Sequence, residues 1–178
     1  MNGTGVEQVD LKQYIEVIPD FPTAGVSFKD VTSLLQNGKA LRFAVEQIAA
    51  WAEKMGAEAI VGPEARGFLF GTPVAYELGI GFVPVRKPGK LPRATLEVKY
   101  NLEYGMDCLQ IHRDSLRAGQ KVVIVDDLLA TGGTIGTTIK LVEELGAEVV
   151  GLAFLIELVY LDGRNKLDDY NIFSLIEY

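Results

Sequence analysis

Two patterns of apolar residues follow one another along the chain. In one, apolar side chains recur at the spacing of a helix face and a glycine follows the last of them, as in Leu41, Val45, Ile48, Ala52 and Met55 before Gly56. In the other, short unbroken apolar runs are bounded by turn residues, which is typical of strands buried on both faces. These patterns predict helices at 11–18, 41–55, 68–78 and 133–145, and strands at 59–62, 82–85, 108–112, 121–125, 149–156 and 172–176.

Apolar strands separated by helices favour an α/β fold with a largely parallel sheet covered by helices on both faces. The 178 residues, 48% hydrophobic and 23% charged, suit a single domain over 1–178. The stretch 86–105 has weak periodicity and carries Pro88, Gly89, Pro92 and Gly105. We therefore expect a long flexible loop or a loose ribbon there, a kind of segment that is usually functional or disordered.

The composition limits the metal sites that the chain could form and the cellular locations that we expect for it. One cysteine and one histidine cannot build a metal cluster, so any metal would be held by carboxylates and substrate oxygens, which suits magnesium. No apolar stretch reaches ~18 residues, so we expect no membrane span. The polar, acidic start lacks the features of a signal peptide, and we expect the protein to stay in the cytoplasm.

The net charge of −7 argues against general nucleic-acid binding, which needs a basic face. Positive charge is nevertheless concentrated between 86 and 99, where five basic residues accompany the single acid Glu97. A small basic segment in an acidic protein suggests a compact polyanionic ligand, although a solvated run of charges is the plainer interpretation.

The densest chemistry lies in VVIVDDLLATGGT, residues 122–134. An apolar strand leads into Asp126 and Asp127, a short bend follows, and glycines then open a helix. Glycines let backbone N–H groups approach a phosphate, and the helix N-terminus adds unpaired donors and a positive dipole end. The acid pair would suit ribose hydroxyls or a cation. The alternative is a solvated turn with a glycine-rich cap; neither a Walker A site nor a dinucleotide fingerprint is present.

A second strand-to-helix turn lies at 62–68, GPEARGF. Such a turn is again a potential anion site, and Arg66 could fork onto phosphate oxygens. The alternative is an ordinary surface arginine at a helix start.

The 122–134 segment resembles the phosphoribosylpyrophosphate-binding signature of the type I phosphoribosyltransferases, and its leucine pair and ATGGT are most similar to the adenine-specific members. The resemblance runs from about Tyr14 to the end of the chain. It implies the type I phosphoribosyltransferase fold, with a small N-terminal hood at about 11–37 and the flexible loop at about 86–105. It also implies purine salvage: transfer of the phosphoribosyl group from phosphoribosylpyrophosphate to adenine, giving AMP and pyrophosphate.

The resemblance also implies roles for individual residues. Asp126 and Asp127 would contact the ribose hydroxyls, and Leu129 would line one face of the base pocket. Pyrophosphate would be held by Arg66 with the backbone of Glu64 and Ala65, and by the basic residues Arg86, Lys87 and Lys90. The 5′-phosphate would be cradled by Ala130, Thr131, Gly132, Gly133 and Thr134. Mg²⁺ would be held mainly by substrate and water. Part of the basic contact comes from a neighbouring subunit in this family, which implies a homodimer.

In the hood, Phe28 would stack on the base and the backbone of Ser27 and Lys29 would read its edge. Relatives often carry an apolar residue and an arginine at the latter two positions, a departure that matters only if side chains do the reading. The alternative is a proline-rich turn with Phe21 and Phe28 in a core.

Glu103 is the candidate for proton handling at the base, with Tyr104 as its partner; without the family it is an ordinary exposed glutamate. A C-terminal pattern, which we interpret as structural with Glu157 supporting the base pocket, comprises Glu157, Leu158, Leu161, Gly163 and Arg164.

Two other functions stay open. The chain could act on a 6-oxopurine or orotate, which would change only the hood and base pocket. It could instead sense phosphoribosylpyrophosphate without catalysis, but the residues before Leu11 are too few for a DNA-binding helix pair and the net charge is unfavourable. A phospho-acceptor receiver domain is excluded, because its acid pair would follow the first strand.

Overall fold

The computed structural model describes residues 9–102 and 105–178, and for 100–102 and 105–107 it describes only the backbone. The chain divides into two compact units, the first ending at Ala44 and the second comprising Val45–Tyr178. The first unit contains η1 (Leu11–Tyr14), β1 (Glu16–Ile18), β2 (Phe28–Asp30), α1 (Thr32–Gln36) and the start of α2 (Gly38–Lys54).

The helix predicted at 11–18 is wrong beyond Tyr14. The η1 turn is capped by Asp10, whose side chain accepts a hydrogen bond from the backbone N–H of Lys12. The chain then extends into β1, which pairs antiparallel with β2 from Glu16 opposite Asp30 to Ile18 opposite Phe28. The β-branched residues Val17 and Ile18 favour this extended backbone, and a pairing partner distant in sequence decides the outcome.

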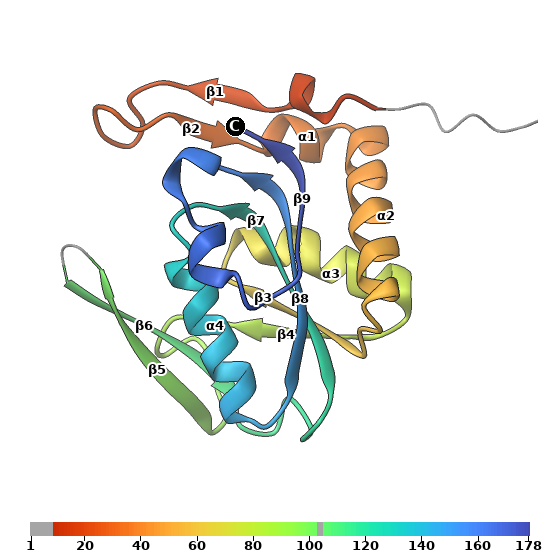
Figure 1. Ribbon diagram of the computed structural model, residues 1–178, viewed down its shortest axis with the longest axis vertical. Helices are drawn as coiled ribbons and strands as arrows, with labels where there is room; N and C mark the ends of the chain where they lie inside the picture. The colour runs from red at the N-terminus through yellow and green to blue at the C-terminus, as the bar shows by residue number, and fades with distance from the viewer. Residues whose placement is uncertain (1–8, 103–104) are drawn as a thin grey trace, which may run out of the picture. The chain divides into compact units, whose positions relative to one another are not determined.

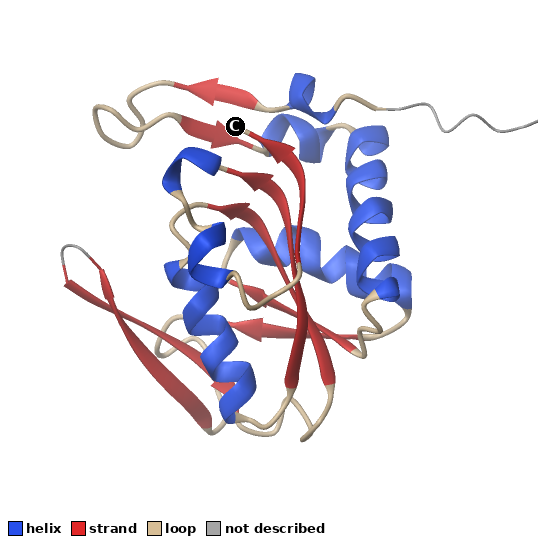
Figure 2. Ribbon diagram, viewed as in Figure 1, coloured by secondary structure: helices blue, strands red, loops and turns tan. Residues whose placement is uncertain are grey.

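The second unit is built on a five-stranded sheet in the order β4-β3-β7-β8-β9, with every neighbouring pair parallel (Figures 1 and 2). Its strands are β3 (Ala59–Pro63), β4 (Gly81–Val85), β7 (Lys121–Leu129), β8 (Glu148–Glu157) and β9 (Ile172–Glu177). All five coincide with predicted strands, because unbroken apolar runs are what a sheet buried on both faces requires. One boundary is wrong: β7 continues through Asp126 and Asp127 to Leu129 instead of bending after them.

Helices α3 (Arg66–Leu78) and α4 (Gly133–Glu144) cover opposite faces of this sheet. On one face, a Cβ added to Gly71 of α3 would lie 2.6 Å from the ring of Phe82, so only a glycine allows this close approach. On the other face, Ile135 and Ile139 of α4 join a buried cluster with Val61 and Ile124. The prediction of a parallel sheet covered on both faces is confirmed.

The arrangement of crossovers marks one end of the sheet. From β3 the chain passes through α3 to β4 on one side, and from β7 it passes through α4 to β8 on the other side. Neighbouring strands β3 and β7 are therefore the point at which the direction of winding reverses. In open α/β sheets, ligands bind in the crevice outside the carboxyl ends of such strands.

The segment expected to be a loop or loose ribbon contains a regular strand. β5 (Thr95–Leu102) pairs antiparallel with β6 (Gly105–His112) over its whole length, and this long ribbon extends beside α4 in Figure 1. Leu96 and Val98 are partly buried against the core cluster, whereas Glu97 and Lys99 are exposed. Of the two alternatives, the ribbon describes 95–102, and the alternation of partly buried and exposed side chains at 96–99 is what a strand with one buried face produces.

Two short turns, η2 (Val159–Leu161) and η3 (Arg164–Leu167), connect β8 to β9. Among the helices in the described ranges, none has the length and apolar character needed to cross a membrane.

Candidate functional site

The carboxyl ends of β3 and β7 open into a cavity of about 270 Å³. Two chain segments line it, one following each strand, and both are strand-to-helix turns that the sequence had singled out. The lining residues are Glu64, Ala65, Arg66, Asp126, Asp127, Leu128, Leu129, Ala130, Thr131, Gly132, Gly133, Thr134 and Ile135. The structure therefore brings together predicted site residues that are up to 70 positions apart in the sequence, Glu64 and Thr134.

The phosphate loop, residues 130–134, connects β7 to α4. Gly132 has a φ of 80°, a left-handed conformation that side chains other than glycine rarely adopt, and it turns the backbone into the helix. The first N–H groups of α4 have no partner within the helix and point out of its end. The loop thus provides backbone donors and a positive dipole end in the cavity, which is the chemistry that a phosphate monoester needs.

Asp126 and Asp127 stand at the end of β7 beside this loop. The Asp127 N–H donates to Asp126 Oδ1 at 2.9 Å, and Asp127 is only 3% exposed. Burial, and then the charge of Asp127, raise the pKa of Asp126 well above its ordinary value; burial also raises the pKa of Asp127, although Arg66 opposes that shift. The two carboxyl groups are held as hydrogen-bond acceptors in a poorly solvated place, which suits ligand hydroxyl groups.

Arg66 begins α3 and is paired with the acid pair. Its Nε lies 2.9 Å from Asp127 Oδ2, while about two fifths of its side chain (41%) stays exposed. The peptide bond between Glu64 and Ala65 immediately before it is cis. Gly67 follows, and a Cβ there would lie 3.0 Å from Asp126 Oδ1, so the close contact between α3 and β7 depends on this glycine.

The basic residues Arg86, Lys87 and Lys90 do not line the cavity, but two of them contact its wall. Glu64 accepts a hydrogen bond from Arg86 Nε at 2.6 Å and another from the Lys87 backbone N–H at 3.1 Å. Arg86 also donates to the Lys90 carbonyl at 3.3 Å and lies 5.9 Å from the Phe68 ring centre. The start of the basic segment is therefore fixed beside the Glu64–Arg66 turn.

The predicted base-binding residues Ser27, Phe28 and Lys29 belong to the first compact unit. Lys29 Nζ donates to Ser27 Oγ at 2.9 Å, and Phe28 packs edge to face on Phe21 with ring centres 5.1 Å apart. Phe21 is 51% exposed, so the alternative that places it in a core is wrong. The candidate proton-handling residues Glu103 and Tyr104 lie outside the described residues.

Sequence reasoning missed residues that pack behind the phosphate loop. A Cβ added to Gly163 would lie 2.1 Å from the Ala130 carbonyl oxygen, and Lys166 Nζ donates to the Thr131 carbonyl at 3.2 Å. Gly163 was recognised only as part of a C-terminal pattern. No spacing in the sequence connects it with residue 130, because the contact arises from tertiary packing.

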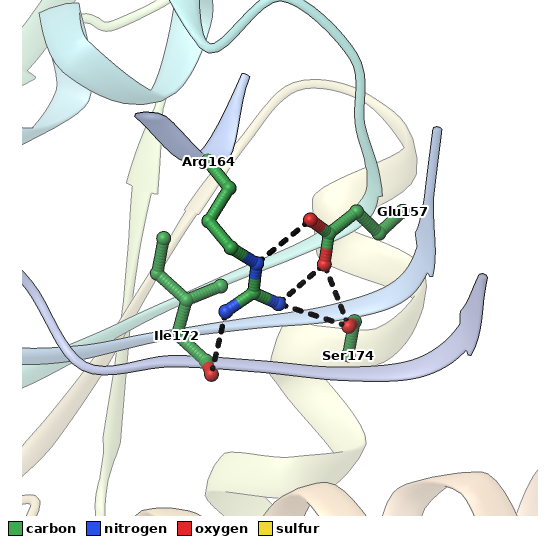
Figure 3. A network of polar contacts seen from close by, with 4 residues as sticks. All are labelled: Glu157, Arg164, Ile172 and Ser174. Carbon is green, nitrogen blue, oxygen red and sulfur yellow. Dashed lines mark hydrogen bonds and ion pairs between the residues drawn. The ribbon is translucent and has the colours of Figure 1, made fainter. Parts of the chain in front are cut away.

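Glu157 does not line the cavity and instead takes part in a polar network (Figure 3). It is 3% exposed, and its carboxylate accepts two hydrogen bonds from the Arg164 guanidinium and one from Ser174 Oγ. Hydrogen bonding to Arg164 holds the pKa of Glu157 below its ordinary value. Its predicted role as a support of the base pocket stays a prediction.

Within the described ranges, no group of three or more His, Cys, Asp or Glu side chains is placed to hold a metal ion. The oxygens of Asp126 and Asp127 are nevertheless hard donors that suit magnesium-bound water. The site therefore fits an ion whose other positions are filled by substrate oxygens and water.

Comparison with known proteins gives consistent relatives. Residues 30–177 match the phosphoribosyl transferase domain family. An adenine phosphoribosyltransferase of Clostridium botulinum (strain Loch Maree / Type A3) is 60% identical over 170 residues, covering 96% of this chain and 99% of its own.

Solved structures agree with this result. A crystal structure of adenine phosphoribosyltransferase from Thermoanaerobacter pseudethanolicus is 57% identical, with a TM-score of 0.92 over 94% of this chain and 98% of that one. The Saccharomyces cerevisiae enzyme, complexed with an imino-altritol bisphosphate and adenine, is 39% identical, with a TM-score of 0.88 over 92% and 95% of the two chains.

Proposed function

The chain belongs to the phosphoribosyl transferase family, and we infer that it transfers the phosphoribosyl group of phosphoribosylpyrophosphate to adenine, forming AMP and pyrophosphate in purine salvage. The observation that carries this function is the single cavity in which the phosphate loop, the acid pair and the Arg66 turn meet. Each of these features matches one part of the sugar substrate. The identity of the base rests on the relatives, whose names specify adenine.

The sugar would be held at both ends. Backbone N–H groups of residues 130–134 and the start of α4 would bind the 5′-phosphate, and Asp126 and Asp127 would accept hydrogen bonds from the ribose hydroxyls. This contact fixes the anomeric carbon, from which pyrophosphate leaves as positive charge builds on the ring. The negative charge of the acid pair nearby favours such a charge distribution.

Pyrophosphate would leave toward Arg66. The guanidinium already occupies the cavity wall, and the Glu64–Ala65 backbone beside it would contribute further donors. Arg86, Lys87 and Lys90 would add positive charge from the adjacent segment, whose start is held beside this turn by Glu64. Mg²⁺, when bound mainly through substrate oxygens and water, would neutralise part of the pyrophosphate charge.

Leu129 would line one face of the base pocket, and the roles of Ser27, Phe28 and Lys29 in binding the base stay predictions. Leu129 is 1% exposed and ends β7 at the cavity. Glu103, with Tyr104, stays the candidate for accepting the purine proton; in sequence the two residues connect β5 to β6. We also propose a homodimer in which a neighbouring basic segment completes the pyrophosphate site; a cytoplasmic location stays a prediction.

A steady-state assay tests this function. The protein would be supplied with phosphoribosylpyrophosphate, Mg²⁺ and, separately, adenine, hypoxanthine, guanine, xanthine or orotate, and nucleotides would be separated by chromatography. We expect AMP to form at least about 100-fold faster than any other nucleotide, since a site that hydrogen-bonds one base edge strongly rejects others.

Two other results would contradict parts of this proposal. Preferential formation of IMP, GMP or orotidylate would contradict the assignment of adenine while leaving the sugar site intact. No nucleotide from any base, with phosphoribosylpyrophosphate still bound, would favour a sensor.

A further inference from the structure

The phosphate loop is packed from behind by the segment that follows β8. The Leu158 N–H donates to the Leu129 carbonyl at 2.9 Å, just before the loop. Gly163 lies against the loop itself: a Cβ there would lie 2.1 Å from the Ala130 carbonyl oxygen and 3.2 Å from the Gly132 nitrogen. The contact is reciprocal, since a Cβ on Gly132 would lie 3.1 Å from the Gly163 carbonyl oxygen. Backbone atoms of the two segments thus lie in direct contact.

A forked arginine holds this segment in place (Figure 3). Arg164 Nε donates to Glu157 Oε1 at 2.8 Å, and its Nη2 pairs with Oε2 of the same carboxylate. Its Nη1 donates to the Ile172 carbonyl at 3.4 Å, and Ser174 Oγ donates to Glu157 Oε2 at 2.8 Å. The arginine therefore ties η3 to the ends of β8 and β9.

The anchor of this network is adjacent to the site. Glu157 is 3% exposed and is paired in register with Leu129, the last residue of β7. An arginine one residue after Gly163 thus fixes that glycine relative to the strand from which the phosphate loop departs. Lys166 adds a further contact, donating to the Thr131 carbonyl at 3.2 Å.

We propose that Gly163 and Arg164 position the phosphate loop from behind and so set the affinity of the site for a sugar phosphate. Neither residue lines the cavity, so each is a positioning residue rather than a catalytic one. The proposal rests on the function inferred above only for the name of the ligand, the 5′-phosphate of phosphoribosylpyrophosphate.

The physical reason is preorganisation. A loop with consecutive glycines has many accessible conformations, and ordering it upon binding would weaken affinity. A rigid wall behind the loop removes that freedom before the ligand arrives. Backbone N–H groups then already point at the phosphate, as effective anion sites require.

The test compares three variants of the full chain with the wild type. Gly163→Ala introduces a Cβ into the loop contact, whereas Gly81→Ala is its control, because a Cβ on Gly81 meets no atom within 4 Å. Arg164→Lys keeps the positive charge but cannot form the two-pronged contact with Glu157. Binding of ribose 5-phosphate would be measured by calorimetry, and KM for both substrates and kcat by steady-state kinetics.

We expect Gly163→Ala to raise the Kd for ribose 5-phosphate and the KM for phosphoribosylpyrophosphate about 10-fold or more, and Arg164→Lys about 3-fold to 10-fold. The KM for adenine should change less than about 2-fold, and kcat measured at saturating phosphoribosylpyrophosphate should stay close to the wild-type value. Gly81→Ala should match the wild type.

Unchanged ribose 5-phosphate affinity in a folded Arg164→Lys variant would overturn the proposal, as would an equal rise in both KM values. Should Gly163→Ala not fold, Arg164→Lys decides alone, with thermal unfolding confirming its folded state. Because ribose 5-phosphate binding is measured without a base, the result stands even if no AMP is formed, so failure of the proposed function would be recognised separately.

Discussion

At the level of single residues, Asp126 shows how a side chain that suits a binding site can lower the free energy of unfolding. Its carboxyl group lies beside a second carboxyl and against α3, and its pKa is raised well above the ordinary value of 3.8. Over the pH interval between those two pKa values, the folded protein binds more protons than the unfolded chain. The free energy of unfolding therefore falls as pH rises through that interval. The acid pair thus supplies acceptor oxygens to the site at a cost in stability.

Replacing Asp126 by asparagine should therefore separate stability from activity. Asp126→Asn keeps the oxygen that accepts from the Asp127 N–H and removes the buried charge. We expect the free energy of unfolding at pH 7 to rise by about 1 kcal/mol and kcat/KM for phosphoribosylpyrophosphate to fall at least about 10-fold. Thermal unfolding from pH 3 to 8 and steady-state kinetics check this.

The pH dependence gives the control. The gain in stability should disappear as pH falls to the ordinary carboxyl range, where Asp126 is protonated in both folded and unfolded states. The exposed Asp169→Asn should change stability by no more than about 0.5 kcal/mol. A lower stability of Asp126→Asn at pH 7 would contradict this account of the acid pair.

At the level of elements, the close packing of helices on the sheet depends on glycines that face large aromatic side chains. Gly151 in β8 faces Trp51 of α2, whose ring stacks on Phe173 of β9 with centres 5.4 Å apart. A Cβ on Gly151 would lie 2.4 Å from the Trp51 ring. Without a side chain at this position, the indole can approach the strand closely.

Gly151→Ala should force this indole away from the sheet. Because the ring is fixed by its stacking on Phe173, we expect a loss of about 1–3 kcal/mol in the free energy of unfolding, measured by urea denaturation with tryptophan fluorescence. Gly81→Ala in β4 is the matched control and should remain within about 0.5 kcal/mol of the wild type. Equal stability of both variants would show that the ring adapts freely.

The sequence predicts elements well where burial is complete and poorly where it is one-sided. β3, β7 and β8 were predicted because short continuous apolar runs are typical of strands that are buried on both faces. β5 was predicted only as a loop or a loose ribbon, because Leu96 and Val98 are the apolar side chains of its described part that pack against the core and prolines precede them. β1 was read as part of a helix because its partner, β2, lies beyond a turn.

At the scale of the whole molecule, the site exists because winding reverses between β3 and β7. Both cavity-lining turns could be predicted from the sequence, because each combines a strand end, a glycine and charged residues within a few positions. The rear support of the phosphate loop could not, since Gly163 and Ala130 are joined only by folding. Short sequence segments therefore predict which groups line the cavity, whereas the rigidity of the phosphate loop depends on contacts between segments that are distant in the sequence.

The proposed homodimer can be tested through shared sites. If Lys87 of one subunit completes the pyrophosphate site of its neighbour, Lys87→Ala and Asp127→Asn should each be weakly active alone. Refolding them together in equal amounts should restore up to about a quarter of wild-type activity, because half of the dimers would contain one intact site. Activity no higher than that of the separate variants, in a mixture shown to contain heterodimers, would mean that Lys87 acts within its own subunit or not at all.

The most direct test of the whole account is crystallography of two complexes, one with AMP bound and one with ribose 5-phosphate and pyrophosphate bound. We predict the 5′-phosphate on the N–H groups of residues 130–134, the ribose hydroxyls on Asp126 and Asp127, and pyrophosphate on Arg66. Phosphate bound away from this loop, or a ribose that makes no contact with the acid pair, would contradict the assignment of the cavity as the site of phosphoribosyl transfer.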